Sequence, residues 1–417
     1  MKIILYYLSI VALLSSCLSE KNADPGKPNT FVRYFNGGND DYAKVAEETS
    51  DGGIIILGTT EISDKTDLSA KTYKIKLIET DEYGNVIWQT IHPDFTSVQS
   101  FKGHSLLQLP KGGFMVIGES VLTGGKTDMY ILEVDANGVI VNEKTIDFGI
   151  TVVANSLSIQ GKAIQLSTTD KKKIDEGNYN YLVLGAIPGA ADNMVLAELD
   201  KSDLSVKWVK KYGAGTSSLS NKIYLDASNN VFWSGTVTRS SSDIRLVKTA
   251  QNSLSTIFDL PIGKPDFQEE GIDICRYGFG FAVVGNTNES IAGGQDILFK
   301  ILAEDGSELL SKSFGFGDTD TGNSVTSARG GIVILGTSLA VPLDSGGRGE
   351  EDYYLMKFDA FGKRVWPKPR VFGSKNRDLG ASVRQMADGS LLVLGTTDFG
   401  GVKTMMLMKA DREGNIE

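Results

Sequence analysis

A short apolar run that ends in glycine occurs seven times along this 417-residue chain, and it constrains the fold more than any other feature. The copies are IIILG, FMVIG, YLVLG, VFWSG, FAVVG, IVILG and LLVLG, ending at Gly58, Gly118, Gly185, Gly235, Gly285, Gly336 and Gly395. Successive glycines are 50 to 67 residues apart. A unit of this size that recurs along the whole chain indicates a repeat architecture, in which neighbouring units bury each other's apolar faces.

Each unit contains four strand-like segments. A short segment, such as residues 44–47, is joined to the glycine run by a tight turn such as Asp51-Gly52-Gly53. Gly, Asn and Asp tolerate the positive φ angles that such hairpins require. A third segment such as DYYLMKFD follows, and a second Asp/Gly turn leads into a fourth. Four antiparallel strands repeated seven times, with no sustained helical period, predict an all-β fold: a seven-bladed β-propeller of four-stranded blades.

The two ends of the repeat complement each other. The seventh copy reaches the turn before its fourth strand at residues 411–417, while residues 30–35 (TFVRYF) precede the first copy and read as a strand. We therefore predict that this N-terminal strand completes the last blade and closes the ring, which removes an exposed sheet edge.

Residues 30–417 resemble bacterial β-propeller proteins whose repeats have the form FGG…D…DGG…G-T…D-x-Y-L-x-K-x-D…G…W. The resemblance implies a secreted or surface protein and specifies architecture rather than activity. The third copy departs from it with QLSTTDKKKIDEGN in place of the Asp-Gly-Gly turn, and the fourth has TAQNSLS in place of the second turn.

The first seventeen residues have the pattern of a secretory signal. Lys2 precedes an apolar stretch over residues 3–14, which is too short for a permanent membrane span. Leu14-Ser15-Ser16-Cys17 resembles the lipobox of bacterial lipoproteins, which implies a signal peptide over residues 1–16 and lipid attachment at Cys17. Residues 17–29 then read as the lipidated cysteine and a flexible tether, and residues 30–417 as the propeller.

The residues after Cys17 imply a location. Ser19 stands where an Asp would retain a lipoprotein of Gram-negative bacteria in the inner membrane, and the following polar run resembles surface-export signals of Bacteroidota lipoproteins. We expect a protein anchored to the outer membrane by its lipid, on the periplasmic or the surface face. The membrane is then one partner of the chain. The net charge of −10 opposes phosphate backbones, so we expect no nucleic-acid partner.

The chain offers few groups for catalysis or metal binding. With only His92 and His104, we expect neither a histidine-based metal site nor a Ser-His-Asp triad. Cys275 lies in an apolar run and reads as a small buried core residue. We therefore assign no catalytic residue, no metal ligand and no cofactor, and the ligand-binding residues are unknown at this stage.

Several acidic and aromatic residues recur at equivalent places, which indicates structural roles. We expect the recurring aspartates to hold turns by accepting backbone N–H groups; they are Asp41, Asp128, Asp192, Asp243, Asp296, Asp320, Asp352 and Asp378. The DTDTG sequence at residues 318–322 resembles the start of a calcium loop but lacks the closing Glu, so we read it as a solvated turn. We expect Trp88, Trp208 and Trp366 to pack between blades.

Two function classes follow. The leading one is a non-catalytic binding or scaffold protein for a glycan or an envelope protein, acting as a monomeric ring. The alternative is a glycan-active hydrolase or lyase, which requires two carboxylates at a suitable separation. The sequence reveals no acid cluster specific to one blade, and two acids converging in the central channel would favour the enzyme. Long inserts at residues 59–71, 119–127 and 337–351 indicate a loop face suited to recognition.

Overall fold

The structure is a computed structural model. It describes residues 30–63, 71–93, 99–121, 127–146, 160–186, 194–212, 216–219, 222–238, 241–289, 293–339, 341–342 and 346–416. The signal peptide, Cys17, the tether and Asp192 lie outside the described residues, so the interpretations of them stay predictions. In the described part of the chain, no helix has the length and apolar character needed to cross a membrane.

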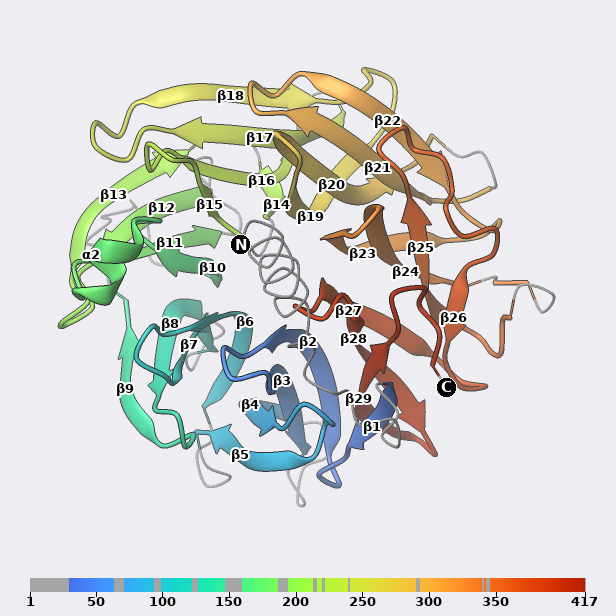
Figure 1. Ribbon diagram of the computed structural model, residues 1–417, viewed down its shortest axis with the longest axis horizontal. Helices are drawn as coiled ribbons and strands as arrows, with labels where there is room; N and C mark the ends of the chain where they lie inside the picture. Colours follow the sequence, from blue (N-terminus) through green and yellow to red (C-terminus); the bar gives the residue numbers. More distant parts are fainter. Residues whose placement is uncertain are drawn as a thin grey trace, which may run out of the picture.

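Seven antiparallel sheets form a ring, which confirms the predicted seven-bladed β-propeller (Figure 1). Blade 1 contains β2 (Asp40–Glu48), β3 (Ile54–Ser63), β4 (Lys71–Thr80) and β5 (Val86–His92). Blade 2 contains β6 (Ser100–Gln108), β7 (Phe114–Val121), β8 (Thr127–Val134) and β9 (Ile140–Thr145). Blade 3 contains β10 (Gln160–Leu166), β11 (Tyr181–Ala186), β12 (Met194–Leu199) and β13 (Val206–Tyr212). In each blade the first strand lies nearest the ring axis (Figure 1).

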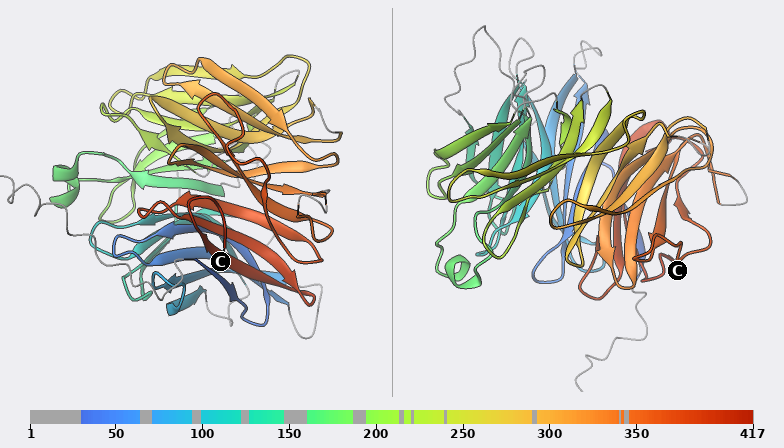
Figure 2. Two further views of the ribbon diagram at one scale, coloured as in Figure 1. Left: turned by 45° about the vertical axis from the view of Figure 1, so that its right-hand side comes forward. Right: turned by 90° about the horizontal axis from the view of Figure 1, so that it is seen from above.

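The remaining blades keep this order with one variation. Blade 4 has a divided inner strand, β14 (Thr216–Leu219) and β15 (Tyr224–Leu225), followed by β16 (Val231–Thr238), β17 (Ser242–Thr249) and β18 (Thr256–Ile262). Blade 5 contains β19 (Glu269–Tyr277), β20 (Gly280–Thr287), β21 (Asp296–Ala303) and β22 (Glu308–Phe314). Blade 6 contains β23 (Asp320–Ala328), β24 (Gly331–Ser338), β25 (Asp352–Phe358) and β26 (Arg370–Phe372). Figure 2 shows the ring from two further directions.

Blade 7 is built from both ends of the described chain. Its strands are β27 (Asp378–Gln385), β28 (Leu391–Phe399), β29 (Val402–Ala410) and β1 (Phe31–Phe35). β1 pairs antiparallel with β29, from Phe31 opposite Lys409 to Phe35 opposite Met405. The predicted closure by the N-terminal strand is therefore confirmed, with the sheet order β1-β29-β28-β27.

Hairpin turns form where the sequence predicts them. Gly52 in the first copy has φ +90°, and Asn229 takes the same place in the fourth copy with φ +59°.

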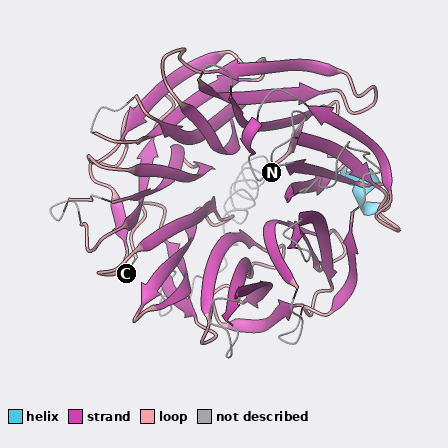
Figure 3. Cartoon of the chain, turned by 180° about the vertical axis from the view of Figure 1, so that it is seen from behind, coloured by secondary structure: helices cyan, strands magenta, loops and turns pink. Residues whose placement is uncertain are grey.

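The departure of the third copy from the repeat has a structural result that the sequence did not predict. Its hairpin carries a short helix, α2 (Lys171–Asp175), started by Asp170, whose side chain accepts the N–H of Lys172 (Figure 3).

Apolar faces of neighbouring blades form the core. One cluster joins Ile55 and Leu57 of blade 1 to Val116 and Leu132 of blade 2, all at most 1% exposed. The predicted tryptophans lie at such seams. Trp88 donates its indole N–H to the carbonyl of Ala136 in the next blade, and Trp366 donates to Glu413. Trp208 packs against a cluster shared by blades 3 and 4. The expected packing between blades is confirmed.

Four of the recurring aspartates hold turns as expected. Each accepts the N–H of the residue four positions earlier: Gly37 for Asp41, Phe316 for Asp320, Arg348 for Asp352 and Ser374 for Asp378. These carboxylates are at most 2% exposed, so the bonds replace solvation that burial removes.

Candidate functional site

Each inner strand carries one extra residue. In all seven blades the register between the innermost strand and its neighbour shifts by one residue, which is the pattern of a β-bulge. The bulged residues are Lys44, His104, Lys162, Ser217, Ile272, Asn323 and Ala381. Because bulges redirect side chains, this position is where the blades of a regular ring can differ.

The glycine of the sequence repeat makes the bulge possible. In six blades it lies directly opposite the residue before the bulged one, as Gly118 lies opposite Gly103. A Cβ atom on Gly118 would lie 1.9 Å from the carbonyl oxygen of Lys102, and one on Gly285 would lie 1.6 Å from that of Glu270. Both distances are far inside van der Waals contact. The repeated glycine is therefore required by the close approach of the bulged strand.

The residue after that glycine joins neighbouring blades. Its side-chain oxygen accepts a hydrogen bond from an inner-strand N–H of the next blade. Thr396 accepts from the N–H of Ala43 at 2.9 Å, and Thr337 accepts from the N–H of Gly380 at 3.0 Å. Thr236 and Asn286 make the same bond to Gly271 and Gly322, both at 3.0 Å. These bonds explain why the repeat ends in Gly followed by a residue with a short polar side chain in these blades.

The inner strands surround a cavity of about 270 Å³ on the ring axis, and four of the bulged residues line it: Lys44, His104, Asn323 and Ala381. Every blade contributes to its wall through its innermost strand or the residues beside it. The polar and charged side chains of the wall are those of Lys44, Glu47, His104, Ser105, Gln165, Lys222, Tyr224, Asp273, Asn323, Ser324, Thr326, Ser382 and Arg384. Apolar positions such as Ile164 and Ile223 lie between them. A concave site with a few placed polar groups is the usual form of a small-ligand site.

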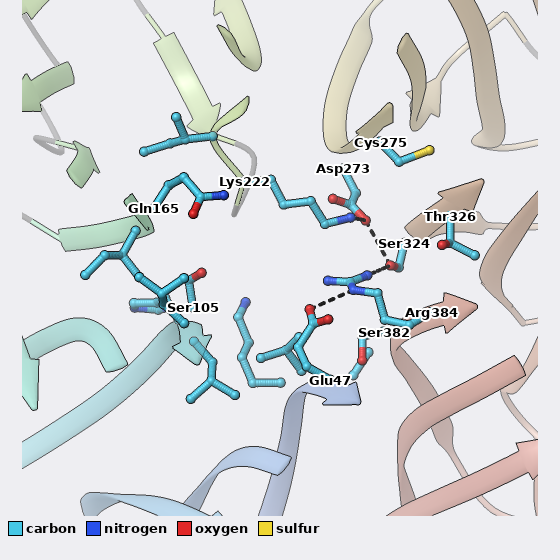
Figure 4. A pocket seen from close by; sticks show the side chains of 18 of the residues that line it. Glu47, Ser105, Gln165, Lys222, Asp273, Cys275, Ser324, Thr326, Ser382 and Arg384 are labelled. Atoms are coloured by element: carbon cyan, nitrogen blue, oxygen red, sulfur yellow. Dashed lines mark hydrogen bonds and ion pairs between the residues drawn. The ribbon is translucent and has the colours of Figure 1, made fainter. Parts of the chain in front are cut away.

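A chain of polar contacts crosses this cavity (Figure 4). Arg384 donates from Nε to Glu47 Oε1 at 2.7 Å and from Nη1 to Ser324 Oγ at 3.4 Å. Ser324 Oγ donates to Asp273 Oδ2 at 2.8 Å, and Lys222 Nζ donates to the same oxygen at 3.0 Å. Residues of blades 1, 4, 5, 6 and 7 are thereby connected. Two of the cations in the wall each have an acidic partner.

Asp273 is held in its charged form. Burial alone would raise its pKa, but Lys222 and Arg384 beside it and the N–H of Val325 hold the pKa below its usual range. The same residue joins neighbouring inner strands, because Val325 belongs to the next blade. Ser324 and Ser382 do likewise, accepting the N–H groups of Val383 and Ala46. Asp273 is thus part of the framework of the ring.

Two acids of the cavity wall are linked indirectly. Glu47 and Asp273 come from blades 1 and 5 and are connected through Arg384 and Ser324. They belong to different blades, so the expectation that no single blade carries an acid cluster of its own is not contradicted. The link between these two residues becomes visible only once the strands are paired.

A cysteine and a histidine, Cys275 and His104, also line the cavity, although the sequence analysis assigned neither of them a role in a site. Cys275 is buried, at 6% exposed, as predicted, and burial raises the pKa of its thiol to about 12. His104 was considered only as a metal or triad ligand; it lies at the bulge of blade 2. Among the described residues no group of three or more His, Cys, Asp or Glu side chains is arranged to hold a metal ion.

The predicted loop face is only partly described. The strands extend into the proposed inserts, because β3 continues to Ser63, β7 to Val121 and β24 to Ser338. Most residues between these strands and the next lie outside the described ranges. The hypothesis that this face carries the binding site therefore stays a prediction, and the described geometry directs attention to the axis instead.

The chain is similar to several solved structures. No protein family model matches the chain, and no curated protein matches its sequence. Among solved structures, a protein of unknown function from Bacteroides caccae has a TM-score of 0.42 and 10% identity over 81% of this chain and 97% of that one. A protein of unknown function from Dyadobacter fermentans DSM 18053 has a TM-score of 0.47 and 11% identity over 92% of this chain and 100% of that one. A mutant of Trypanosoma rangeli sialidase displaying trans-sialidase activity has a TM-score of 0.40 and 9% identity over 92% of this chain and 59% of that one.

Proposed function

We propose that this protein is a non-catalytic binding protein of the bacterial cell envelope, lipid-anchored at Cys17, and that its ligand occupies the axial cavity. The observation that carries the proposal is the cavity wall. All seven blades contribute to it, and polar side chains in it are already fixed by mutual hydrogen bonds. Groups fixed before binding lose little conformational entropy when a ligand arrives.

The cavity size supports a small ligand or the end of a larger one. A volume of about 270 Å³ lies just below the range of about 300–1,000 Å³ that is usual for small-molecule sites. It fits one sugar ring or one acidic side chain rather than an extended chain. Both expected partner classes, a glycan and an envelope protein, are therefore compatible with a terminal group that enters the axis.

A glycan-active hydrolase is the second candidate, and the presence of two carboxylates, Glu47 and Asp273, in one cavity wall favours it. Such enzymes usually require one carboxylic acid whose pKa is raised so that it donates a proton to the leaving group. Asp273 has the opposite property, because its neighbouring cations lower its pKa, and its Oδ2 accepts bonds from Lys222, Ser324 and Val325. A carboxylate with these bonds is poorly placed to act as an acid or a nucleophile. The geometry therefore supports binding more strongly than turnover.

The test is a glycan-array screen of the purified full chain, with a parallel assay for product release. The cavity variant is Ala381→Leu, which adds volume at a lining position without removing a charge. The matched control is Ala387→Leu, the same change at an exposed turn. The proposal predicts binding without release, lost in the cavity variant and kept in the control. Release of product that Glu47→Gln abolishes would establish the enzyme instead.

A further inference from the structure

The bulge position divides the ring into two chemically different parts. In blades 1, 2 and 3 it carries Lys44, His104 and Lys162, whereas in blades 5, 6 and 7 it carries Ile272, Asn323 and Ala381. We call the first three residues the basic arc. They occupy equivalent positions on three consecutive inner strands. Lys44 and His104 line the cavity, and Lys162 lies close enough to Lys44 to lower its pKa, although Lys162 is not among the lining residues. A repeat that serves only packing gives no reason for three nitrogen-bearing side chains in a row.

The two lysines of the basic arc lack the close acidic partners that the other cavity cations have. Arg384 is paired with Glu47 and Lys222 with Asp273. Within the described part of the chain, neither Lys44 nor Lys162 makes a hydrogen bond or an ion pair shorter than 4 Å. Glu119 of β7 is the acid nearest to the arc, at 3.8 Å from His104 Nε2 and 4.0 Å from Lys102 Nζ. One carboxylate therefore faces several nitrogen groups.

The electrostatics of the arc agree with this geometry. Burial, and then the neighbouring Lys162, lower the pKa of Lys44 to about 8. Burial lowers the pKa of Lys162 as well, and lowers that of His104 to about 4, so the imidazole is neutral at neutral pH. His104 Nε2 is buried without a hydrogen-bond partner. An anion placed here would pair with Lys44 and offset the repulsion between the two ammonium groups.

We propose that the basic arc is an anion-binding subsite, and that the axial cavity takes a ligand that bears a carboxylate or a sulfate, such as an acidic sugar. This inference rests on the proposed function and names its ligand class. Lys44 pairs with the anion, His104 offers a hydrogen bond from its ring, and Lys162 behind them adds a second positive charge. The paired groups on the opposite wall, Arg384 and Ser324 among them, face the uncharged part of the ligand.

Other titratable groups face Lys44 and set its response to pH. They are Glu47 on its own strand, His104 and Glu119 of blade 2, Lys162 of blade 3, Lys222 of blade 4, Asp273 of blade 5 and Arg384 of blade 7. The carboxylates of Glu47 and Asp273 are already paired with cations. Lys44, with a pKa of about 8, changes its charge between pH 7 and 9. Burial lowers the pKa of Lys162 and of Lys222 as well.

The experiment measures the affinity of the full chain for glucuronate, glucose and inorganic sulfate by titration calorimetry at constant ionic strength. We expect glucuronate to bind at least tenfold more tightly than glucose, and sulfate to compete with glucuronate. Lys44→Met should weaken glucuronate binding about tenfold or more, because a charge-assisted bond is lost. Lys162→Met should weaken it less, because that ammonium acts from behind the cavity wall. Lys111→Met, at an exposed turn, is the matched control and should leave the affinity unchanged.

A pH series gives a second readout. The affinity for glucuronate should be constant between pH 6 and 7.5 and fall above about pH 8, where Lys44 loses its proton. In Lys44→Met this fall should shrink. If Lys44→Met does not fold, the same pH series is measured with Lys44→Gln, and sulfate is titrated into the natural protein.

The outcomes separate this inference from the proposed function. Equal affinity for glucose and glucuronate, with binding lost in Ala381→Leu, would overturn the anion subsite and leave the cavity as the ligand site. Glucuronate binding that Ala381→Leu leaves intact would overturn both. No binding of glucuronate, sulfate or inorganic phosphate at millimolar concentration would overturn the anion subsite.

Discussion

Arg384 of the last blade donates to the carboxylate of Glu47 of the first blade at 2.7 Å, across the seam where the ring closes. The two residues are 337 positions apart in the chain. The bond from the N–H of Ala43 to Thr396 bridges the same seam, and the pairing of β1 with β29 within blade 7 joins the start of the described chain to its end. The cavity wall is therefore complete only when the ring is closed, so the proposed ligand binding requires a closed ring.

Removing apolar side chains from β1 should destabilise the whole ring. Phe31 and Phe35 are 8% and 7% exposed and pack in the cluster between blades 7 and 1. We expect Phe31→Ala and Phe35→Ala each to lower the free energy of unfolding by about 3–5 kcal/mol, measured by urea denaturation. Tyr34→Ala on the same strand is the control, because that ring is 55% exposed. An unchanged midpoint in both core variants would contradict closure by this strand.

The repeated glycine should tolerate no side chain where the bulged strand lies against it. In Gly285→Ala the new Cβ would lie 1.6 Å from a backbone oxygen, so the strands must separate. We expect a loss of at least about 2 kcal/mol, in the range of overpacked cores. Gly37→Ala is the control, since its Cβ would first meet a side-chain atom, Lys76 Nζ, at 3.3 Å, and no backbone atom lies within 4 Å. Equal melting temperatures for the two variants would refute the explanation of the repeat.

Arg384 should be required for its charge as well as its size. Arg384→Met leaves Glu47 unpaired and removes one cation beside Asp273. We expect a loss of about 1–3 kcal/mol of unfolding free energy, moderate because the Glu47 side chain is 39% exposed and partly solvated. Arg384→Lys should recover part of it. If Met and Lys variants are equally stable in denaturation experiments, the pair contributes only packing.

Asp273 should make the ring sensitive to acid. Its pKa is lower in the folded state than the usual value of about 3.9, so its contribution is present above that pH and is lost as the pH falls further. The difference in stability between the natural chain and Asp273→Asn should therefore be constant from pH 7 to 5 and shrink below about pH 4. Urea denaturation across this range measures it. A constant difference down to pH 3 would show that the charge of Asp273 is not stabilising.

Much of the fold follows from local patterns. The glycine runs, the Asp/Gly turns and the strand at residues 30–35 predict the blades and their closure, because each reports on one hairpin or one pairing. The helix α2 was missed because its five residues are too few to show a helical period. Four of the recurring aspartates, Asp41, Asp320, Asp352 and Asp378, close a turn with a residue four positions away, as the sequence predicts.

The site was not predictable in the same way. Lys44, His104 and Lys162 are separated by about sixty residues each, and nothing in their local sequence distinguishes them from solvent-facing residues. Only the bulge, which depends on the pairing of two strands, makes these positions equivalent. The sequence analysis looked for asymmetry in the loops, whereas the described structure has it on the axis.

The measurement that tests the central claim most directly is a crystal structure of the full chain with bound glucuronate or sulfate. The account predicts the ligand in the axial cavity, with an anionic oxygen about 2.7–3.0 Å from Lys44 Nζ and the pairs of Arg384 with Glu47 and Lys222 with Asp273 intact. A ligand bound instead on the loop face around residues 59–71, 119–127 or 337–351, with the cavity unchanged, would contradict it.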